Sequence, residues 1–436
     1  MSFRRVWAVS RFTTRDTTRH NPNLIRSSAA FEMHFQVDRR ASRRDELVET
    51  LPMHPDRGAW HCAMSSAVFD TEAARCVAAV GGTEETLFLV GTQKLRGNNH
   101  VHVLAHDRDR DVVTSRAIFA HHPEIWDLQP CPSDPTLLAT IYNPSSGSPD
   151  YGGAVWRLPD GASAVDPAPA SAPDAPARRD RASLESVASF VGLSGPASCA
   201  RWNPTKPGVL ATADAASIAV WSLADASLAR VASGAVAEGR LPGGGAWDPR
   251  DPESFAVVVG SSLLVWDLRA PHQGPACAVD TAHDAQARDA EFHPRRPREV
   301  ATCGDDGVVR RWDLRNPSSP AATDRRRGHA HWVWTVRHNP VYESLFATGS
   351  SDGTARLWRD GDGGAGRGDH ASGRAGIGRD GDPRGDDGEV CRYDAEDSVY
   401  GIAWSAADPW SFASLSYDGR LAVNAVPRAE KYKILL

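Results

Sequence analysis

Short runs of apolar and β-branched residues, broken by tight-turn signals, follow one another along most of the 436-residue chain. In the stretch LFATGSSDGTARLW (345–358), two such runs flank an Asp-Gly pair. This arrangement predicts two antiparallel strands joined by a tight turn. No apolar run approaches the roughly 18 residues that a membrane-spanning helix needs. The pattern therefore predicts an all-β chain built from hairpins, with no direct membrane insertion.

Tryptophans mark a long repeat in this pattern. Trp221, Trp266, Trp312 and Trp358 are spaced 45, 46 and 46 residues apart, and prolines close the motifs RWNP, AWDP, EFHP and RHNP in the same register. A fixed period of this length indicates a repeat architecture. Continued in both directions, the register predicts seven units, ahead of six or eight. The marker positions of the seven units are Leu104, Trp156, Trp221, Trp266, Trp312, Trp358 and Asn424.

Polar residues keep the same register. His283 and His329 each lie 29 residues before a marker tryptophan, and an Asp-Gly turn lies between each histidine and its tryptophan. Together with the dipeptides Gly-His and Trp-Asp, this arrangement resembles the WD-repeat β-propeller. The His, the turn Asp and the Trp indole N–H can hydrogen-bond inside one blade, where an unpaired polar group would be costly. The residues expected to hold the blades are His283, Asp306, Trp312, His329, Asp352, Trp358, Trp266 and Asp418.

Three segments depart from the repeat. Residues 1–59 are rich in Arg, and only Asp16 is acidic before Glu32; this composition fits a disordered extension, a transit peptide or a mis-assigned start. Residues 159–182 hold five Pro and eight Ala, which predicts a stiff extended linker. Residues 360–389 hold eleven Gly among Asp and Arg, which predicts a disordered loop. We therefore expect a seven-bladed propeller over residues 60–436 with two disordered inserts and a disordered N-terminal extension.

The chain ends on an apolar stretch, KYKILL (431–436). Asp418-Gly419 supplies the turn of the seventh unit, so this stretch follows where an outermost strand belongs. We expect it to form that strand and to close the ring against residues near the start of the propeller, because closure removes exposed sheet edges.

The composition mainly excludes classes of partner and of chemical site. A net charge of −6 gives no general affinity for nucleic acid or anionic lipid. Seven scattered cysteines without a Cys-x-x-Cys pair argue against a zinc site and a disulfide framework, and indicate a reducing compartment. His100 and His102 could ligate a metal from one strand face, but a half-exposed structural strand is favoured. No nucleophile motif is present, so no catalytic residue, metal or cofactor is predicted, and the chain is expected to be no enzyme.

A binding surface can be predicted from the register. Aligning the strand that follows each Gly-His motif puts Trp334 in register with Trp126, Arg288 and Tyr400. In WD-repeat folds this innermost strand begins near one mouth of the central channel, and Trp332 lies two residues earlier. Trp, Tyr and Arg dominate binding hot spots. We predict that these five side chains form a partner-binding rim; the alternative is that some of the rings cap the core beneath it.

The tetrapeptide WDLR occurs at 266–269 and again at 312–315. It resembles the Trp-Asp-x-Arg box of propellers that serve as substrate receptors for cullin-RING ubiquitin ligases. The box is short and common among WD repeats that never bind a ligase. It implies an alternative function as a ligase substrate receptor.

Longer stretches resemble one family, the EARP- and GARP-complex-interacting proteins. The matching text includes FLVGTQKLRGNNHVHVL (88–104), EIWDLQPCPSD (124–134), ATCGDDGVVRRWDLRNP (301–317), HAHWVWTVRHNPVYESLFATGSSD (329–352) and the whole of 396–436. The resemblance weakens across 160–245 and departs in the first 59 residues and in both inserts. It implies a non-enzymatic adaptor, a single propeller within a larger assembly. Such an adaptor would bind subunits of EARP- and GARP-type tethering complexes and support endosomal recycling and retrograde transport. It would be cytoplasmic and peripheral to the trans-Golgi network and endosomes.

Overall fold

The computed structural model describes residues 67–95, 97–143, 152–159, 182–193, 195–236, 242–318, 320–326, 329–360 and 388–436. The predicted extension at 1–59 and most of both predicted inserts lie outside these residues. The described residues form 29 β-strands, one 3-10 helix and one α-helix.

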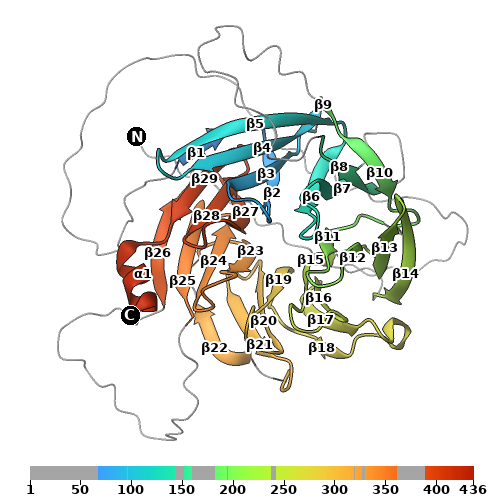
Figure 1. Cartoon of the computed structure of the whole chain (residues 1–436). Helices are drawn as coiled ribbons and strands as arrows, with labels where there is room; N and C mark the ends of the chain where they lie inside the picture. The colour runs from blue at the N-terminus through green and yellow to red at the C-terminus, as the bar shows by residue number, and fades with distance from the viewer. Residues whose placement is uncertain are drawn as a thin grey trace, which may run out of the picture. The chain divides into compact units, whose positions relative to one another are not determined.

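The strands assemble into seven antiparallel sheets, one for each predicted unit (Figure 1). In chain order of their innermost strands, the first three blades are β2 (Ala74–Ala79), β3 (Thr86–Thr92), β4 (Asn99–Asp107), β5 (Val112–His121) and the short β9 (Ala182–Ser183); β6 (Glu124–Pro130), β7 (Leu137–Asn143), β8 (Gly152–Arg157) and β10 (Glu185–Ser189); and β11 (Cys199–Trp202), β12 (Val209–Ala213), β13 (Ser217–Ala224) and β14 (Ser227–Ala235).

The next three blades follow the same order from inside to outside. They are β15 (Pro242–Trp247), β16 (Ser254–Val259), β17 (Ser262–Asp267) and β18 (Cys277–Val279), with η1 (Pro271–Gln273) between the last two; β19 (Ala287–Phe292), β20 (Glu299–Gly304), β21 (Val309–Asp313) and β22 (Pro320–Arg326); and β23 (Val333–His338), β24 (Leu345–Ser350), β25 (Thr354–Arg359) and β26 (Glu389–Asp394). The seventh blade is β27 (Val399–Trp404), β28 (Ser411–Ser416), β29 (Arg420–Ala425) and, outermost, β1 (Ala67–Asp70).

The innermost strands contact one another in sequence, from β2 through β6, β11, β15, β19 and β23 to β27, and β27 returns to β2. They therefore enclose a channel, and the sheets radiate from it (Figure 1). The seven-bladed all-β propeller predicted from the sequence is confirmed.

Each marker position of the repeat lies on the third strand of its blade, opposite an apolar residue of the second strand. Trp266 lies opposite Phe255, and Leu104 lies opposite Phe88. All four side chains are fully buried. Since each sheet is packed between two neighbours, both faces of its middle strands are covered, and these strands read as continuous apolar runs.

Tryptophans of the innermost strands also join neighbouring blades. The indole N–H of Trp247 donates to the Arg201 carbonyl oxygen at 2.8 Å, and that of Trp404 donates to the Arg337 carbonyl oxygen at 2.9 Å. Each bond reaches back to the preceding blade. The RWNP-type motifs of the sequence thus mark contacts between blades as well as the repeat.

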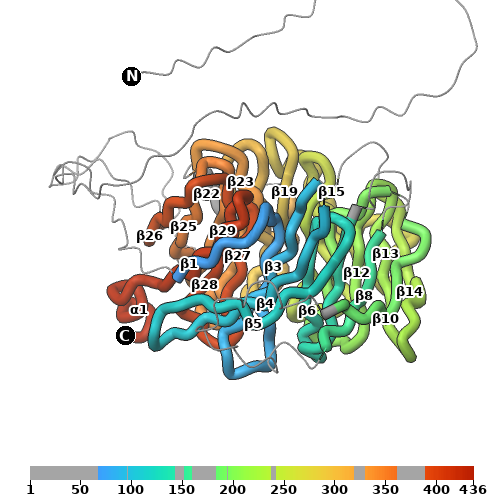
Figure 2. The backbone as a smooth tube through the Cα atoms, turned by 90° about the horizontal axis from the view of Figure 1, so that it is seen from above, coloured from blue at the N-terminus to red at the C-terminus, as the bar shows by residue number. Residues whose placement is uncertain are grey.

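The ring is closed by the N-terminal strand, and the prediction that KYKILL forms the outermost strand was wrong. Residues Ala67–Asp70 pair with Val423–Arg420 of β29, so that edge is already occupied (Figure 2). Pro427, which has no N–H to give to a ladder, ends the extended chain, and Arg428–Leu435 form the helix α1. Ala, Glu, Lys and Leu, which favour helices, make up most of that segment.

The helix α1 packs against the sixth and seventh blades. Its Glu430 is buried and pairs with Arg359 of β25, and Ile434 packs against the apolar cluster between these blades. Tyr432, Leu435 and Leu436 are exposed. The C-terminal segment therefore packs against the sixth and seventh blades without adding a strand to either.

The outer ends of the predicted Gly-rich insert belong to the propeller. Asp360 is 2% exposed and pairs with Arg296 at 2.8 Å and with Arg311. Glu389 begins β26. Residues 361–387 lie outside the described residues.

Candidate partner-binding surface

Five innermost strands carry a β-bulge at the same place near their first residue. The register of pairing shifts past Arg75 in β2, Trp126 in β6, Arg288 in β19, Trp334 in β23 and Tyr400 in β27. A bulge inserts one extra residue into a strand and re-aims its side chain. Five large side chains are thereby presented at the same end of the channel, which we call the channel mouth.

These side chains touch one another in an alternating series of rings and cations. The Trp334 ring lies 4.5 Å from the Tyr400 ring and 5.8 Å from the Trp332 ring, measured between centroids. The Arg288 guanidinium carbon lies 4.4 Å from the Trp334 centroid, and that of Arg75 lies 5.2 Å from it. Trp334 is therefore the centre of the group, and cation–π contacts stabilise it.

The structure brings all five predicted rim residues together, and it adds two that the register did not reveal. Trp126 joins the group through Arg75, whose guanidinium carbon lies 5.0 Å from its ring centroid, and Tyr417 joins through a ring contact with Tyr400 at 5.5 Å. Trp126, Trp332 and Tyr417 are each about two-fifths exposed, at 39%, 40% and 39%. We call this set the mouth surface: Arg75, Trp126, Arg288, Trp332, Trp334, Tyr400 and Tyr417.

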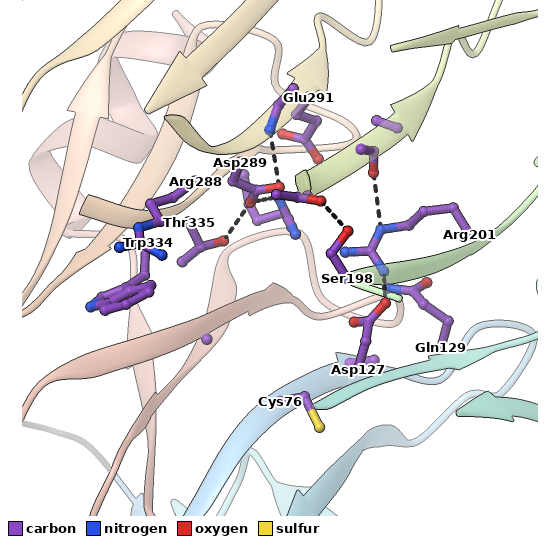
Figure 3. A pocket seen from close by; sticks show the side chains of 18 of the residues that line it. Cys76, Asp127, Gln129, Ser198, Arg201, Arg288, Asp289, Glu291, Trp334 and Thr335 are labelled. Carbon is purple, nitrogen blue, oxygen red and sulfur yellow. Dashed lines mark hydrogen bonds and ion pairs between the residues drawn. The ribbon is translucent and has the colours of Figure 1, made fainter. Parts of the chain in front are cut away.

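Ion pairs between neighbouring innermost strands lie deeper in the channel (Figure 3). Asp127 of β6 pairs with Arg201 of β11, and Asp289 of β19 pairs with Arg337 of β23. Asp289 also accepts a hydrogen bond from Thr335 Oγ1 at 3.1 Å. Burial raises the pKa of the Asp289 carboxyl, and the neighbouring guanidinium groups oppose this rise. Both carboxylates hold adjacent blades together.

A cavity of about 590 Å³ lies among these strands. Its border on the side of β15 is made of Gly243, Gly244 and Gly245. A Cβ on Gly244 would lie 2.0 Å from Asp289 Oδ1, so only glycine fits there. The channel mouth is thus lined by large rings and arginines over five blades and by glycines on the fourth.

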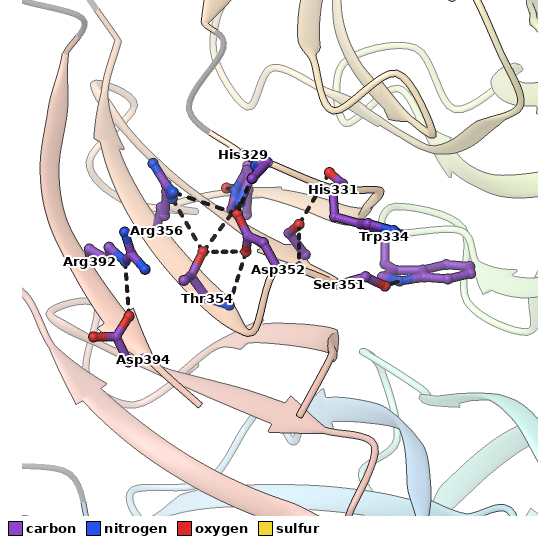
Figure 4. Close-up of polar contacts among 12 residues, drawn as sticks. His329, His331, Trp334, Ser351, Asp352, Thr354, Arg356, Arg392 and Asp394 are labelled. Atoms are coloured by element: carbon purple, nitrogen blue, oxygen red, sulfur yellow. Dashed lines mark hydrogen bonds and ion pairs between the residues drawn. The ribbon is translucent and has the colours of Figure 1, made fainter. Parts of the chain in front are cut away.

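The blade signatures form hydrogen-bonded chains beside the mouth (Figure 4). His329 Nδ1 lies 3.0 Å from Asp352 Oδ2, and its Nε2 lies 2.7 Å from Thr348 Oγ1, which accepts the Trp358 indole N–H at 2.8 Å. Burial lowers the pKa of His329. Burial alone would raise the pKa of Asp352, but the hydrogen bond from His329 holds it well below its usual range. His283, Asp306, Thr302 and Trp312 repeat the arrangement, and the pKa of Asp306 is lowered to about 2.

Two of the predicted signature residues behave differently. The indole N–H of Trp266 is buried without a hydrogen-bond partner in the described residues, because Val257 stands where the other four blades with a marker tryptophan have threonine. Trp266 therefore belongs to its blade through packing, fully buried opposite Phe255. Asp418 accepts hydrogen bonds from Ser416 Oγ and the Arg420 N–H and shapes the turn before β29. Asn424, at the seventh marker position, donates to Ser414 Oγ at 2.8 Å.

The arginines of the two WDLR boxes lie in equivalent places at the ends of β17 and β21. Arg269 pairs with Asp251 at 2.8 Å, and Arg315 pairs with Asp313 at the same distance. Their side chains are 57% and 66% exposed. They are surface groups on neighbouring blades.

Two clusters that contain histidine carry side chains of the types that ligate metals. His100 and His102 lie on β4, a buried middle strand, so the half-exposed strand expected there was wrong. Burial lowers the pKa of His102 to about 4. The group His293, Glu299 and Asp360 has metal-ligand spacing, but its carboxylates already pair with Arg296 and Arg311. Two guanidinium groups in contact with the site disfavour a further cation.

Neither of the two helices in the described residues is long and apolar enough to cross a membrane. The comparisons with known proteins agree with the propeller geometry. The family model of the EIPR1 β-propeller matches residues 63–358. The chain belongs to the EIPR1 β-propeller family.

Relatives in this family align with most of the chain. EARP and GARP complex-interacting protein 1 of Rattus norvegicus is 35% identical over 376 residues, and its Homo sapiens counterpart is 34% identical over 376 residues. WD repeat-containing protein DWA2 of Arabidopsis thaliana is 31% identical over 367 residues. Each alignment covers 81% of this chain and 94% of the relative. The chain therefore aligns with nearly the full length of these relatives.

Proposed function

We propose that this chain is a non-enzymatic adaptor that binds EARP- and GARP-type tethering complexes through the mouth surface. In this role it acts in the cytoplasm at endosomes and the trans-Golgi network, as one propeller within a larger assembly, and supports endosomal recycling and retrograde transport. Two relatives that share 94% of their length with the chain carry names that state an interaction with both complexes.

The mouth surface is the observation that carries the proposal. Its aromatic rings and arginines are the residue types that supply most binding energy in protein interfaces. They converge from different blades, and three of the rings are more than a third exposed. The core does not require such large side chains at bulged positions, because the fourth blade has glycines there.

The channel chemistry favours binding over catalysis. The described carboxylates Asp127 and Asp289 are each engaged by an arginine of the next blade. A general acid or base needs a carboxylate that can reach substrate and exchange a proton. Here the carboxylates act as links between blades.

A variant of the central ring tests the proposal. Trp334→Ala removes a ring that contacts Trp332, Tyr400 and two arginines. We expect it to weaken binding to the tethering complex by on the order of 2 kcal/mol while the fold stays intact. Tyr432→Ala is the matched control, because Tyr432 is an aromatic residue 64% exposed on α1.

The measurement is affinity purification from the native organism, with tethering-complex subunits quantified by mass spectrometry and folding checked by thermal unfolding. Wild type and Tyr432→Ala should recover the subunits, and Trp334→Ala should not. Recovery of a cullin adaptor with no tethering subunit would contradict the proposal. A Trp334→Ala protein with lost stability and unchanged binding would show that this ring belongs to the core.

Exposure of the two WDLR arginines in equivalent positions favours a second candidate, a substrate receptor of a cullin-RING ligase. The double variant Arg269→Ala and Arg315→Ala tests it in the same purification. Loss of a ligase adaptor in this variant would support the second candidate. Unchanged recovery of tethering subunits in the same sample would show that the boxes serve no part of the proposed adaptor function.

A further inference from the structure

One cation of the mouth surface has no carboxylate partner in the described part of the chain. The guanidinium carbon of Arg75 lies 5.0, 5.2 and 5.0 Å from the ring centroids of Trp126, Trp334 and Tyr400. These rings belong to three different blades. Arg75 makes no hydrogen bond or ion pair through its guanidinium to any described residue, so the rings are its only close side-chain neighbours of opposite electrostatic character.

The other arginines that line the cavity are paired. Arg201 has Asp127, Arg337 has Asp289, and Arg288 binds Asp305 through two nitrogens at 2.6 and 2.7 Å. Arg75 therefore carries the one uncompensated positive charge among the described arginines of the cavity.

Because Arg75 is partly buried, the lack of a carboxylate partner in the described residues is unfavourable in free energy. Burial lowers the pKa of Arg75, and the charge of Arg288 lowers it further, while the Tyr400 hydroxyl opposes the change. Rings alone return only part of the solvation that a guanidinium loses, and a carboxylate in the fork of a guanidinium returns more. A site of this kind is completed by an anion that the described residues do not supply.

We propose that the mouth surface binds an extended segment of a partner protein, and that an Asp or Glu side chain of this segment pairs with Arg75. This inference rests on the proposed function for the kind of partner. One uncompensated charge matches a singly charged carboxylate better than a doubly charged phosphate. Trp126, Trp334 and Tyr400 provide flat apolar walls for the neighbouring residues of such a segment.

The test uses a phage-displayed library of random 12-residue peptides, selected on the immobilised full-length chain. Each displayed peptide is fused to the phage at its C-terminus and carries no phosphate, so its only carboxylates are side chains. Enriched peptides are then synthesised with amidated C-termini, and their affinities are measured by fluorescence polarisation.

We expect the enriched peptides to share an acidic position. Replacing that residue by its amide, or changing Arg75→Met in the protein, should weaken binding roughly tenfold or more, the loss typical of a hydrogen bond to a charged group. Arg230→Met is the matched control, because Arg230 also lies over a tryptophan ring, at 4.9 Å from the Trp221 centroid, but on the outer strand β14. It should leave the affinity unchanged.

Enriched peptides without a shared acidic residue, equal affinity for wild type and Arg75→Met, or a selection that enriches nothing would each overturn the inference. The amide substitution is made in the peptide, so it tests the ion pair even if Arg75→Met folds poorly. Failure of tethering subunits to co-purify with the wild-type chain would contradict the proposed function alone, because the selection uses no such subunit.

Discussion

In the fifth blade, one threonine hydroxyl hydrogen-bonds to two buried ring nitrogens. Thr302 Oγ1 lies 2.9 Å from the Trp312 indole nitrogen and 2.8 Å from His283 Nε2. The indole N–H can only donate, so the threonine oxygen accepts it and turns its own proton toward the imidazole. The other imidazole nitrogen then carries the hydrogen that Asp306 accepts. This order of donors places a hydrogen on Nδ1 of His283.

Replacing the threonine of one blade by valine, and the valine of another blade by threonine, should change the free energy of unfolding in opposite directions. Thr302→Val leaves the buried nitrogens of His283 and Trp312 without partners, and we expect a loss of about 1–3 kcal/mol in the free energy of unfolding. Val257→Thr offers Trp266 the acceptor that it lacks, and we expect a gain of about 1 kcal/mol. Urea unfolding of both variants measures these changes. Equal stabilities would show that the chain of hydrogen bonds contributes nothing to folding.

The second blade has a related chain that makes stability depend on pH. His121 Nδ1 donates to the Pro123 carbonyl oxygen, and its Nε2 lies 3.1 Å from Thr140 Oγ1, which accepts the Trp156 indole N–H. Burial lowers the pKa of His121 to about 4. The unfolded chain therefore binds more protons than the folded one between about pH 6.5 and 4, and stability falls as the pH falls through this window.

The contribution of His121 can be isolated by substitution. Lowering the pH from 7.5 to 5 should cost about 2 kcal/mol through this residue alone. His121→Gln, which does not titrate, should lose less stability over the same interval by that amount. Urea unfolding of both proteins at the two pH values measures the difference. Parallel losses would mean that His121 is protonated equally in both states.

The sequence reveals the histidine, aspartate and tryptophan of these hydrogen-bonded series better than the threonine that connects them. His283, His329 and the turn aspartates stand out because they recur at a fixed distance from a tryptophan. The threonines were missed, because threonine is ordinary in a strand. Their signal is the spacing: Thr212, Thr302 and Thr348 lie 9, 10 and 10 residues before the tryptophan that they accept from.

At the level of the element, the β-bulges decide what reaches the channel mouth. Four of the five bulged residues follow from aligning the blades. Arg75 does not, because the first blade lacks the Asp-Gly turn that lies 18 residues after Arg288, Trp334 and Tyr400. A bulge depends on how two strands pair, and pairing across strands is not written in the local pattern of either strand.

The terminal helix shows a second limit of local pattern. We expect deletion of Lys433–Leu436 to lower the free energy of unfolding by only about 1–2 kcal/mol, because Ile434 is the one apolar side chain of the four that packs on the core cluster. Thermal unfolding should shift by a few degrees. The comparison is Glu430→Ala, which leaves the helix length unchanged and removes the carboxylate that pairs with Arg359. Loss of folding on deletion would restore a closing role for the terminus.

For the whole propeller, the sequence predicts the number of blades but not which end of the chain supplies the strand that closes the ring. Seven marker positions, the central four of them evenly spaced, fix seven sheets, since each marker needs its own partner strand. Either end of the chain could supply the last strand. The choice follows from Pro427, which ends the extended backbone after β29, and from the short run of Ala67–Asp70, whose alternation alone is too brief to predict a strand.

Closure by β1 makes a few residues count for the stability of the entire ring. A chain without residues 1–66 keeps β1, and a chain without residues 1–70 lacks it, so the difference between the two isolates the strand. We expect the second to be less stable by on the order of 4 kcal/mol, from the lost ladder hydrogen bonds and the packing of Ala67 and Phe69 against the cluster of the first and seventh blades. It should also self-associate, because the edge of β29 becomes available for pairing. Urea unfolding and sedimentation of both truncated chains measure these effects, and equal unfolding midpoints would show that the ring stays closed through its innermost strands alone.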